Sequence, residues 1–214
     1  MSSSVTFLKI NEVNFNDLKF PKLSSGRKFL SVFYNKKKLG VKLPKLRIPF
    51  DTKISPFNTV ELNVSLGANQ ELISKFEELD RVIPAFAEEH NWNVENLEYA
   101  PTLKKSNSSY PPTIKLKVPV KDSEIVCTFF DDSKEEIKVK TQEEVCNLLP
   151  KGTNLLTAIE CTGVWFNDSK YGVSWKLSQA RVEKHKTVEE LMEDCAFEDD
   201  SDLESIESNL LIDE

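Results

Sequence analysis

The sequence predicts a mainly β protein, in which short strands form a small Greek-key barrel, one long helix is inserted and an acidic tail follows. Three observations support this prediction: several short runs rich in β-branched and aromatic residues, a single long stretch with helical periodicity, and a final segment with acids but no bases. No βαβ alternation and no internal repeat occurs, which argues against a parallel α/β sheet. We place the basic body at residues 1–187 and the tail at 188–214, and expect the tail to be largely disordered because high charge dominates it.

The strands are predicted from runs that favour extended backbone. The run Thr59–Leu66 alternates apolar and polar residues at a period of two and ends at Gly67, which is typical of a half-buried strand. Pro44 and Pro49 interrupt the run Leu39–Phe50, so we expect an edge or a bulge there. Other strands are expected at Val5–Ile10, Lys28–Asn35, Thr113–Val118, Ile125–Phe130 and Glu136–Lys140, and a closing hairpin at Leu155–Phe166 and Tyr171–Val182.

One long helix is expected after Asn69. The apolar residues from Leu72 to Phe86 follow three-to-four spacing, which gives an amphipathic stripe. Asn69 is a suitable N-cap, and Pro84 is expected to kink or end the helix near its last turn. Residues 87–112 are expected as an insertion loop, because Ser and Asn are frequent and two adjacent prolines follow. A second, short helix is expected at Gln142–Leu149.

Charge is distributed unevenly along the chain. The 214 residues contain 28 Lys+Arg and 35 Asp+Glu, a net charge of −7. Twelve of the acids follow Lys186, and no basic residue follows it. The body therefore carries about +5 and the tail −12, so that the body attracts phosphate and the tail repels it.

Several classes of protein find no support in the sequence. The two histidines lie outside any catalytic motif, and no phosphate-binding, dinucleotide-binding, metalloprotease or nucleophile-elbow motif occurs. The four cysteines are far apart and form no CxxC pair, which predicts neither a zinc site nor a disulfide framework and favours a reducing compartment. The chain has no signal-peptide h-region and no apolar run of about 20 residues. We therefore expect a soluble, intracellular protein that is not an enzyme, has no cofactor and does not span a membrane.

Two stretches combine basic and aromatic residues, namely residues 33–47 and the terminal hairpin at 163–186. Single-stranded nucleic acid needs both features, because cations follow its backbone and aromatic faces stack on its exposed bases. The two strand lysines at 115 and 117 add to the basic charge of the body. The candidate nucleic-acid-binding residues are Lys36, Lys37, Lys38, Lys42, Lys45, Arg47, Lys115, Lys117, Trp165, Lys170, Tyr171, Trp175, Lys176, Arg181 and Lys184.

These aromatic residues have a second interpretation as core. Side chains alternate along a strand, so Trp165 and Phe166 point to opposite faces and at least one of them should be buried. The same alternation puts Tyr171, Val173 and Trp175 on one face, which a barrel core explains as well as a stacking platform does. The run of lysines at 36–38 can equally be a solvated turn.

The tail holds spaced apolar residues among its acids, which favours a short linear binding segment. The candidate partner-binding residues are Phe197, Leu203, Ile206, Leu210 and Leu211.

Five segments together resemble a known family. They are FYNKKKLGVKLPKLRIPF (33–50), NTVELNVSLG (58–67), ELISKFEELDRVI (71–83), YPPTIKLKVP (110–119) and GVWFNDSKYGVSWKLSQARV (163–182). The chain resembles the single-stranded-DNA-binding proteins of large nucleocytoplasmic DNA viruses, which are similar to the acidic-tailed protein of T7-like phages. Asp51 stands where the pattern has a glycine, and the lysines at 36–38 replace a more neutral turn.

The resemblance implies an OB-fold body that binds single strands in a basic groove. It also implies a tail that competes for that groove and recruits replication proteins such as a polymerase, primase or helicase, and it allows a homodimer. The resemblance further implies a location inside the host cell, either in the cytoplasm within a viral factory or in the nucleus.

The hypothesis is therefore a sequence-nonspecific single-stranded-DNA-binding protein acting in viral DNA replication, recombination or repair. Two other classes stay open on the sequence: an interaction adaptor or acidic chaperone without a DNA role, and a structural virion protein. RNA is an open alternative to DNA, because stacking and phosphate contacts do not distinguish the 2′-hydroxyl.

Overall fold

The computed structural model describes residues 5–22, 26, 28–106 and 109–183. The chain divides into a body, Met1–Glu183, and a second unit, Lys184–Glu214. The second unit lies outside the described residues, as do the predictions made for the acidic tail and for Lys184.

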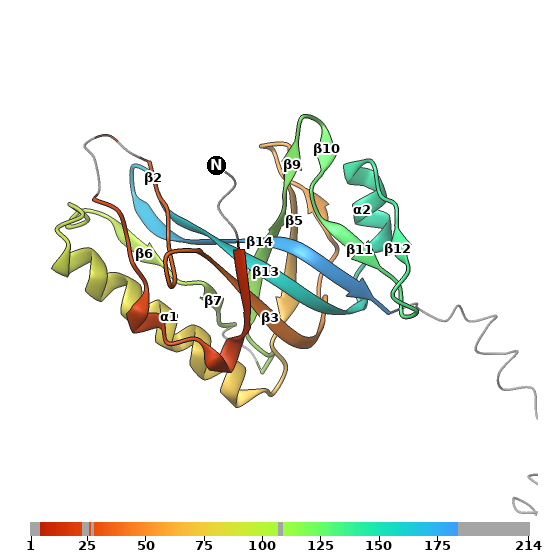
Figure 1. Ribbon diagram of the computed structural model, residues 1–214, viewed down its shortest axis with the longest axis horizontal. Coiled ribbons are helices and arrows are strands. Elements are labelled where there is room, and N and C mark those ends of the chain that lie inside the picture. The colour runs from red at the N-terminus through yellow and green to blue at the C-terminus, as the bar shows by residue number, and fades with distance from the viewer. Residues whose placement is uncertain (1–4, 23–25, 27, 107–108, 184–214) are drawn as a thin grey trace, which may run out of the picture. The chain divides into compact units, whose positions relative to one another are not determined.

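Five strands of the body close into a barrel: β3 (Lys38–Arg47), β5 (Val60–Ser65), β8 (Thr113–Val118), β13 (Asn154–Phe166) and β14 (Lys170–Val182). The sheet runs in the order β14-β13-β3-β5-β8, and β14 pairs again with β8, which closes it (Figure 1). The β8–β14 pair is parallel and the other four pairs are antiparallel. A closed five-stranded Greek-key barrel with this strand order is an OB fold, as predicted.

Shorter strands extend this barrel. β1 (Val5–Lys9) runs parallel to β3, β2 (Phe29–Leu30) pairs with β13, and β4 (Lys53–Ile54) pairs with β5. Three others flank β14 and β8, a fourth pairs with one of these three, and two form a separate hairpin. They are β6 (Glu98–Ala100), β7 (Leu103–Lys104), β11 (Thr128–Phe130), β12 (Glu136–Ile137), β9 (Val120–Lys121) and β10 (Glu124–Ile125). The predicted insertion loop at 87–112 thus contains β6 and β7, which were missed because strands of two or three residues show no periodicity.

Two α-helices pack on opposite ends of the body: α1 (Gln70–Glu89) at the β6 end, and α2 (Gln142–Leu148) beside β11 and β12 (Figure 1). Asn69 caps α1 as expected, because its side chain accepts a hydrogen bond of 3.0 Å from the Leu72 N–H. No helix in the described part of the chain is long and apolar enough to cross a membrane.

Of the two expected outcomes at Pro84, a kink or an end near the last turn, the structure excludes an end at Pro84 itself, because the helix continues to Glu89. Proline removes one helical hydrogen bond and crowds the preceding turn. The last turn is nevertheless held by packing, since the rings of Phe86 and Phe20 lie 5.1 Å apart and Ala87 is buried. Apolar contacts therefore outweigh the local preference of proline at this position.

Pro44 lies at a bulge, as the sequence predicts. The register between β3 and β13 shifts between the pairs Leu43–Thr157 and Leu46–Leu155, so Pro44 falls inside the irregularity. A residue without an N–H is tolerated there because the ladder is already interrupted.

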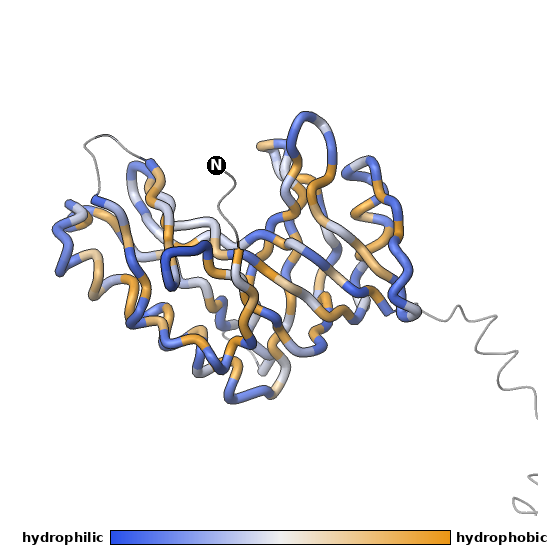
Figure 2. The backbone as a smooth tube through the Cα atoms, in the orientation of Figure 1, coloured by the Kyte–Doolittle hydropathy of each residue, from blue (hydrophilic) through white to orange (hydrophobic). Residues whose placement is uncertain are grey.

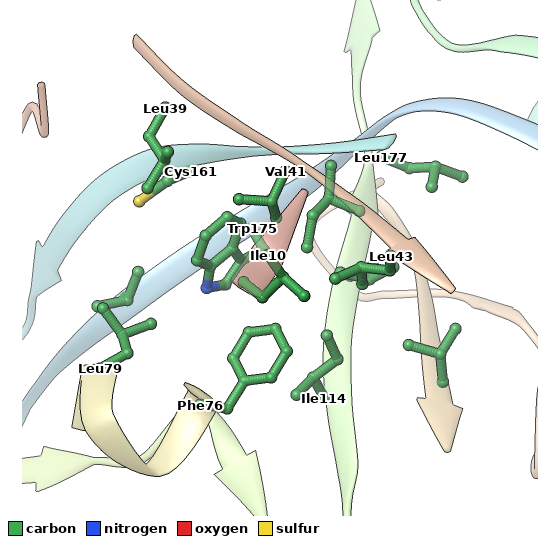
Figure 3. Packing of buried hydrophobic residues seen from close by; sticks show 14 of the residues in the cluster. Ile10, Leu39, Val41, Leu43, Phe76, Leu79, Ile114, Cys161, Trp175 and Leu177 are labelled. Carbon is green, nitrogen blue, oxygen red and sulfur yellow. The ribbon is translucent and has the colours of Figure 1, made fainter. Parts of the chain in front are cut away.

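The core lies between the barrel strands and the apolar side of α1. Orange and blue positions alternate along α1 in Figure 2, and its buried residues include Phe76 and Leu79. Figure 3 shows Phe76 beside Trp175 of β14, with ring centroids 6.1 Å apart in an edge-to-face arrangement. The helix therefore anchors on the barrel strand that also borders the candidate site.

Candidate nucleic-acid interface

A cleft lies at the edge of β14 where this strand changes partner. β14 pairs with β6 from Lys170 to Gly172 and with β8 at Lys176, so Val173–Trp175 lie between the two pairings. The cleft, of about 100 Å³, opens at this position. This β14 cleft is lined by Ala100, Pro101, Thr102, Lys104, Lys115, Lys117, Trp165, Val173, Ser174 and Trp175.

One carboxylate of α1 holds the wall that residues 99–104 form. Asp80 accepts hydrogen bonds from the N–H of Thr102 (2.7 Å), the N–H of Leu103 (2.9 Å) and the Tyr99 hydroxyl (2.7 Å). Burial, together with the adjacent Asp80 carboxylate, raises the pKa of Tyr99 far above its ordinary value. Tyr99 thus remains a hydrogen-bond donor at physiological pH, and the wall stays fixed to the helix.

Three lysines border the cleft. Lys104 belongs to β7, and Lys115 and Lys117 point outward from β8, whose alternate residues are buried. Lys115 forms an ion pair of 2.8 Å with Glu61, whereas Lys104 and Lys117 form no ion pair with any residue that the structure describes. Unpaired, exposed lysines of this kind can neutralise the phosphates of a nucleic acid strand.

Trp165 supplies a half-buried aromatic ring to the cleft. Gly172 lies opposite Trp165 in the hairpin register. A β-carbon at Gly172 would lie 2.7 Å from the Ala100 carbonyl oxygen and 3.1 Å from the Trp165 ring. Only glycine therefore allows the wall, the strand and this ring to approach so closely.

Tyr171 and Trp175 lie in the core, which supports their interpretation as core residues over that as a stacking platform. Their exposed fractions are 5% and 1%. Tyr171 stacks on Phe166 with centroids 6.0 Å apart and planes at 10°, and burial raises its pKa. Trp175 forms the back of the cleft and packs against α1. Neither ring is open to a base in this structure, because strand alternation directs both into the barrel.

The lysine run of the first basic stretch forms a tight turn. Tyr34 and Lys37 exchange backbone hydrogen bonds of 2.8 and 3.0 Å, and Asn35 and Lys36 have positive φ angles of 48° and 64°. Lys36 and Lys37 are exposed and form no ion pair within the described part of the chain. The Tyr34 ring is buried and Phe33 beside it is half-buried, and neither lines the β14 cleft.

Several candidate cations are paired with acids. The buried Glu160 carboxylate lies between Lys38 (3.4 Å) and Lys176 (3.0 Å). Lys170 lies 2.8 Å from Glu98, whose pKa it lowers. Lys45 pairs with Glu183 and lowers its pKa in the same way.

Two further candidate residues, Lys42 and Arg181, line a separate depression of about 320 Å³ with Phe130. Arg47 is exposed at the end of β3 and forms no ion pair with a described residue. The structure thus gathers Lys115, Lys117, Trp165 and Trp175 in the β14 cleft and buries Tyr171. Lys176 pairs in register with Lys117, and the other described candidates do not line the cleft.

Sequence reasoning missed Lys104, which joins the cleft lysines through β7. Lys104 and Lys105 stand in the segment expected as a loop, and no aromatic residue directly adjoins them. Only the pairing of β7 with β8 brings Lys104 to this site, and the sequence shows no periodic signal for that pairing.

No protein-family model matches the sequence, and no curated protein matches it. Among solved structures, the fold is similar to gp2.5, a single-stranded DNA-binding protein encoded by bacteriophage T7. The TM-score is 0.49 at 13% identity, with 75% of this chain and 97% of that chain covered.

The fold is also similar to the single-stranded DNA-binding protein of bacteriophage Enc34. Its C-terminal truncation gives a TM-score of 0.43 at 10% identity, and its complex with ssDNA gives 0.44 at 11%. Each covers 79% of this chain and 97% of that chain. The likeness concerns the fold, and the OB-fold assignment rests on the strand order described above. An origin in a large nucleocytoplasmic DNA virus stays a prediction.

Proposed function

We propose that this chain is a sequence-nonspecific single-stranded-DNA-binding protein. The observation that supports the proposal best is the β14 cleft, in which Trp165 lies among Lys104, Lys115 and Lys117 on the wall of an OB-fold barrel. Rings that stack on bases and cations that follow phosphates are the two requirements of single-strand binding. OB-fold barrels bind oligonucleotides on their strands and adjoining loops.

The mechanism is electrostatic and does not involve a reaction. Lys104 and Lys117 neutralise phosphates and release the counterions condensed on them, which makes binding depend on salt. Trp165 stacks on a base, and because every base has a π-face, the contact does not select a sequence. Lys115 joins them once a phosphate competes with Glu61 for its ammonium group.

The wider role we propose is in viral DNA replication, recombination or repair, within an infected cell. The acidic tail competes with DNA for the basic body, and DNA displaces it. The displaced tail then recruits a polymerase, primase or helicase through its apolar residues. The division of charge between a basic body and a tail of −12 supports this role.

The direct test is fluorescence anisotropy with a labelled oligo-dT, compared with duplex DNA and RNA of equal length. It uses the full chain and a chain that ends at Thr187, across a salt series. We expect tight, salt-sensitive binding to the single strand, strengthened when the tail is removed. The slope of log K against log salt, divided by about −0.7, gives the number of phosphates contacted.

The outcomes separate the parts of the proposal. Absence of binding by both chains at low salt contradicts the DNA-binding function itself. If the shortened chain binds the single strand no more tightly than the full chain does, only the proposed competition by the tail is contradicted. Equal affinity for RNA and DNA still agrees with binding at the cleft, but it contradicts a preference for DNA.

A further inference from the structure

A row of charged residues crosses four strands on the outer face of the barrel. Lys53 of β4 pairs in register with Glu61 of β5, Glu61 with Lys117 of β8, and Lys117 with Lys176 of β14. Residues paired in register lie on the same face of a sheet. We call these four residues the lysine row, and its member Lys117 also lines the β14 cleft.

The lysine row holds three lysines and one acid, Glu61, which lies between Lys53 and Lys117 in the register. Glu61 is paired with Lys115 at 2.8 Å and Lys176 with Glu160 at 3.0 Å, whereas neither Lys53 nor Lys117 forms an ion pair with any described residue. Neighbouring strands lie about 4.8 Å apart, so Lys53 lies on the order of 10 Å from Lys117. A phosphate backbone that leaves the cleft at Lys117 therefore meets a second unpaired cation at Lys53.

An exposed aromatic ring follows this cation in the turn between β4 and β5. Phe57 is 89% exposed, the largest value among the exposed large apolar residues of the described chain. The turn is held by a 3.0 Å hydrogen bond from the Asn58 N–H to the Ser55 carbonyl, and Gln142 of α2 donates a 2.7 Å bond to the Asn58 carbonyl. Phe57 thus extends from a fixed turn and has no ring contact with another described aromatic residue.

We propose that Phe57 is a second base-stacking platform, on which a single strand lies after it has followed the lysine row from the β14 cleft. This inference rests on the proposed function and extends it to a binding site of two platforms, Trp165 and Phe57. The charge of the row favours nucleic acid over an apolar protein partner as the occupant. One OB fold occupies about 4–16 nucleotides, which accommodates both platforms.

The test measures the affinity of the full chain for a short dT oligomer of about 4 nucleotides and a longer one of about 16. Phe57→Ala is expected to weaken binding of the long oligomer by roughly 5- to 100-fold, the size of one stacking contact. It is expected to leave the short oligomer, bound at the cleft, unchanged. Trp165→Ala weakens binding of both oligomers, and Phe57→Tyr, which keeps a π-face, restores binding of the long one.

Phe50→Ala is the matched control, because Phe50 is also an exposed phenylalanine (58%) but precedes the acidic Asp51 and lies outside the turn between β4 and β5. Unfolding of the Phe57→Ala chain by heat is expected at the wild-type temperature, since the ring contacts little. A photo-crosslink from a 5-iodouracil at one end of the long oligomer to the peptide that contains Phe57 gives an independent readout.

If the wild-type chain binds no oligomer, the proposed function fails. If the wild type binds and Phe57→Ala equals it on both lengths, only the inference fails. Equal losses in Phe50→Ala and Phe57→Ala overturn it as well, since they indicate unspecific apolar contact. A change of mass in light scattering with unchanged DNA affinity shows instead that Phe57 contacts protein.

Discussion

The two basic, aromatic stretches of the sequence have different surroundings in the fold. In residues 33–47, the lysines of the turn extend into solvent while Tyr34 is buried. In residues 163–182, Trp165 lines a cleft, but the lysines beside it come from β7 and β8. Neighbours along a strand point to opposite faces, so a lysine next to a ring in the sequence is generally separated from it in the fold. A binding surface is instead assembled across paired strands.

The largest expected effect separates the two tryptophans of the second stretch. Trp175→Ala removes a fully buried ring and is expected to lower the free energy of unfolding by about 3–5 kcal/mol. Trp165→Ala is expected to cost about 1 kcal/mol of stability but to weaken oligo-dT binding roughly 5- to 100-fold. Urea unfolding and anisotropy on both variants measure the two quantities. Equal loss of DNA affinity per folded molecule in both variants contradicts the assignment of Trp175 to the core.

A smaller effect compares a lysine of the β14 cleft with a lysine of the first basic stretch. Lys117→Ala is expected to reduce the salt slope of single-strand binding by about 0.7, the value for one phosphate contact. Lys36→Ala likewise removes an exposed cation, one that forms no ion pair with a described residue, and is expected to change the slope less, because Lys36 lies outside the β14 cleft. An equal change in slope would extend the interface to that turn. Salt titrations of the two variants decide this.

The smallest expected effect concerns Glu160, which joins the two stretches through Lys38 and Lys176. Glu160→Gln is expected to lower the free energy of unfolding by only about 1 kcal/mol, since both lysine side chains remain partly solvated. It releases two cations and is expected to tighten oligo-dT binding a few-fold at low salt. Chemical unfolding and anisotropy test this together, and weaker binding would mean that Glu160 positions the two lysines for DNA.

The barrel strands were predictable because each is long enough to show its pattern. Residues 113–118 alternate buried and outward positions along the whole of β8, and Asn69 caps α1 as its side-chain chemistry requires. Pro84 shows the limit of local preference, since the packing of Phe86 and Ala87 holds a turn that proline disfavours. Alternation predicted that at least one of Trp165 and Phe166 would be buried, whereas the structure leaves both half-buried, with Phe166 packed against the core.

The candidate site was predictable only in part, because it depends on pairing between distant segments. Lys115, Lys117 and Trp165 were identified as candidates from residue type. Lys104 was missed, since β7 has two residues and reaches the cleft only through its pairing with β8. Phe57 carries no signal in the sequence beyond being aromatic, and its significance follows from its exposure and from the register of β4 with β5.

The strand β14 has a consequence for how the protein is made. It is the last strand of the body, and it pairs with β13, β6, β8 and β11. A ribosome adds about 5–20 residues per second, so β8 and β13 wait for their shared neighbour until Val182 has been synthesised. During that interval their open edges can pair with other nascent chains. Closure of the barrel therefore waits for the synthesis of β14, and a chaperone that shields strand edges would act in the interval before it.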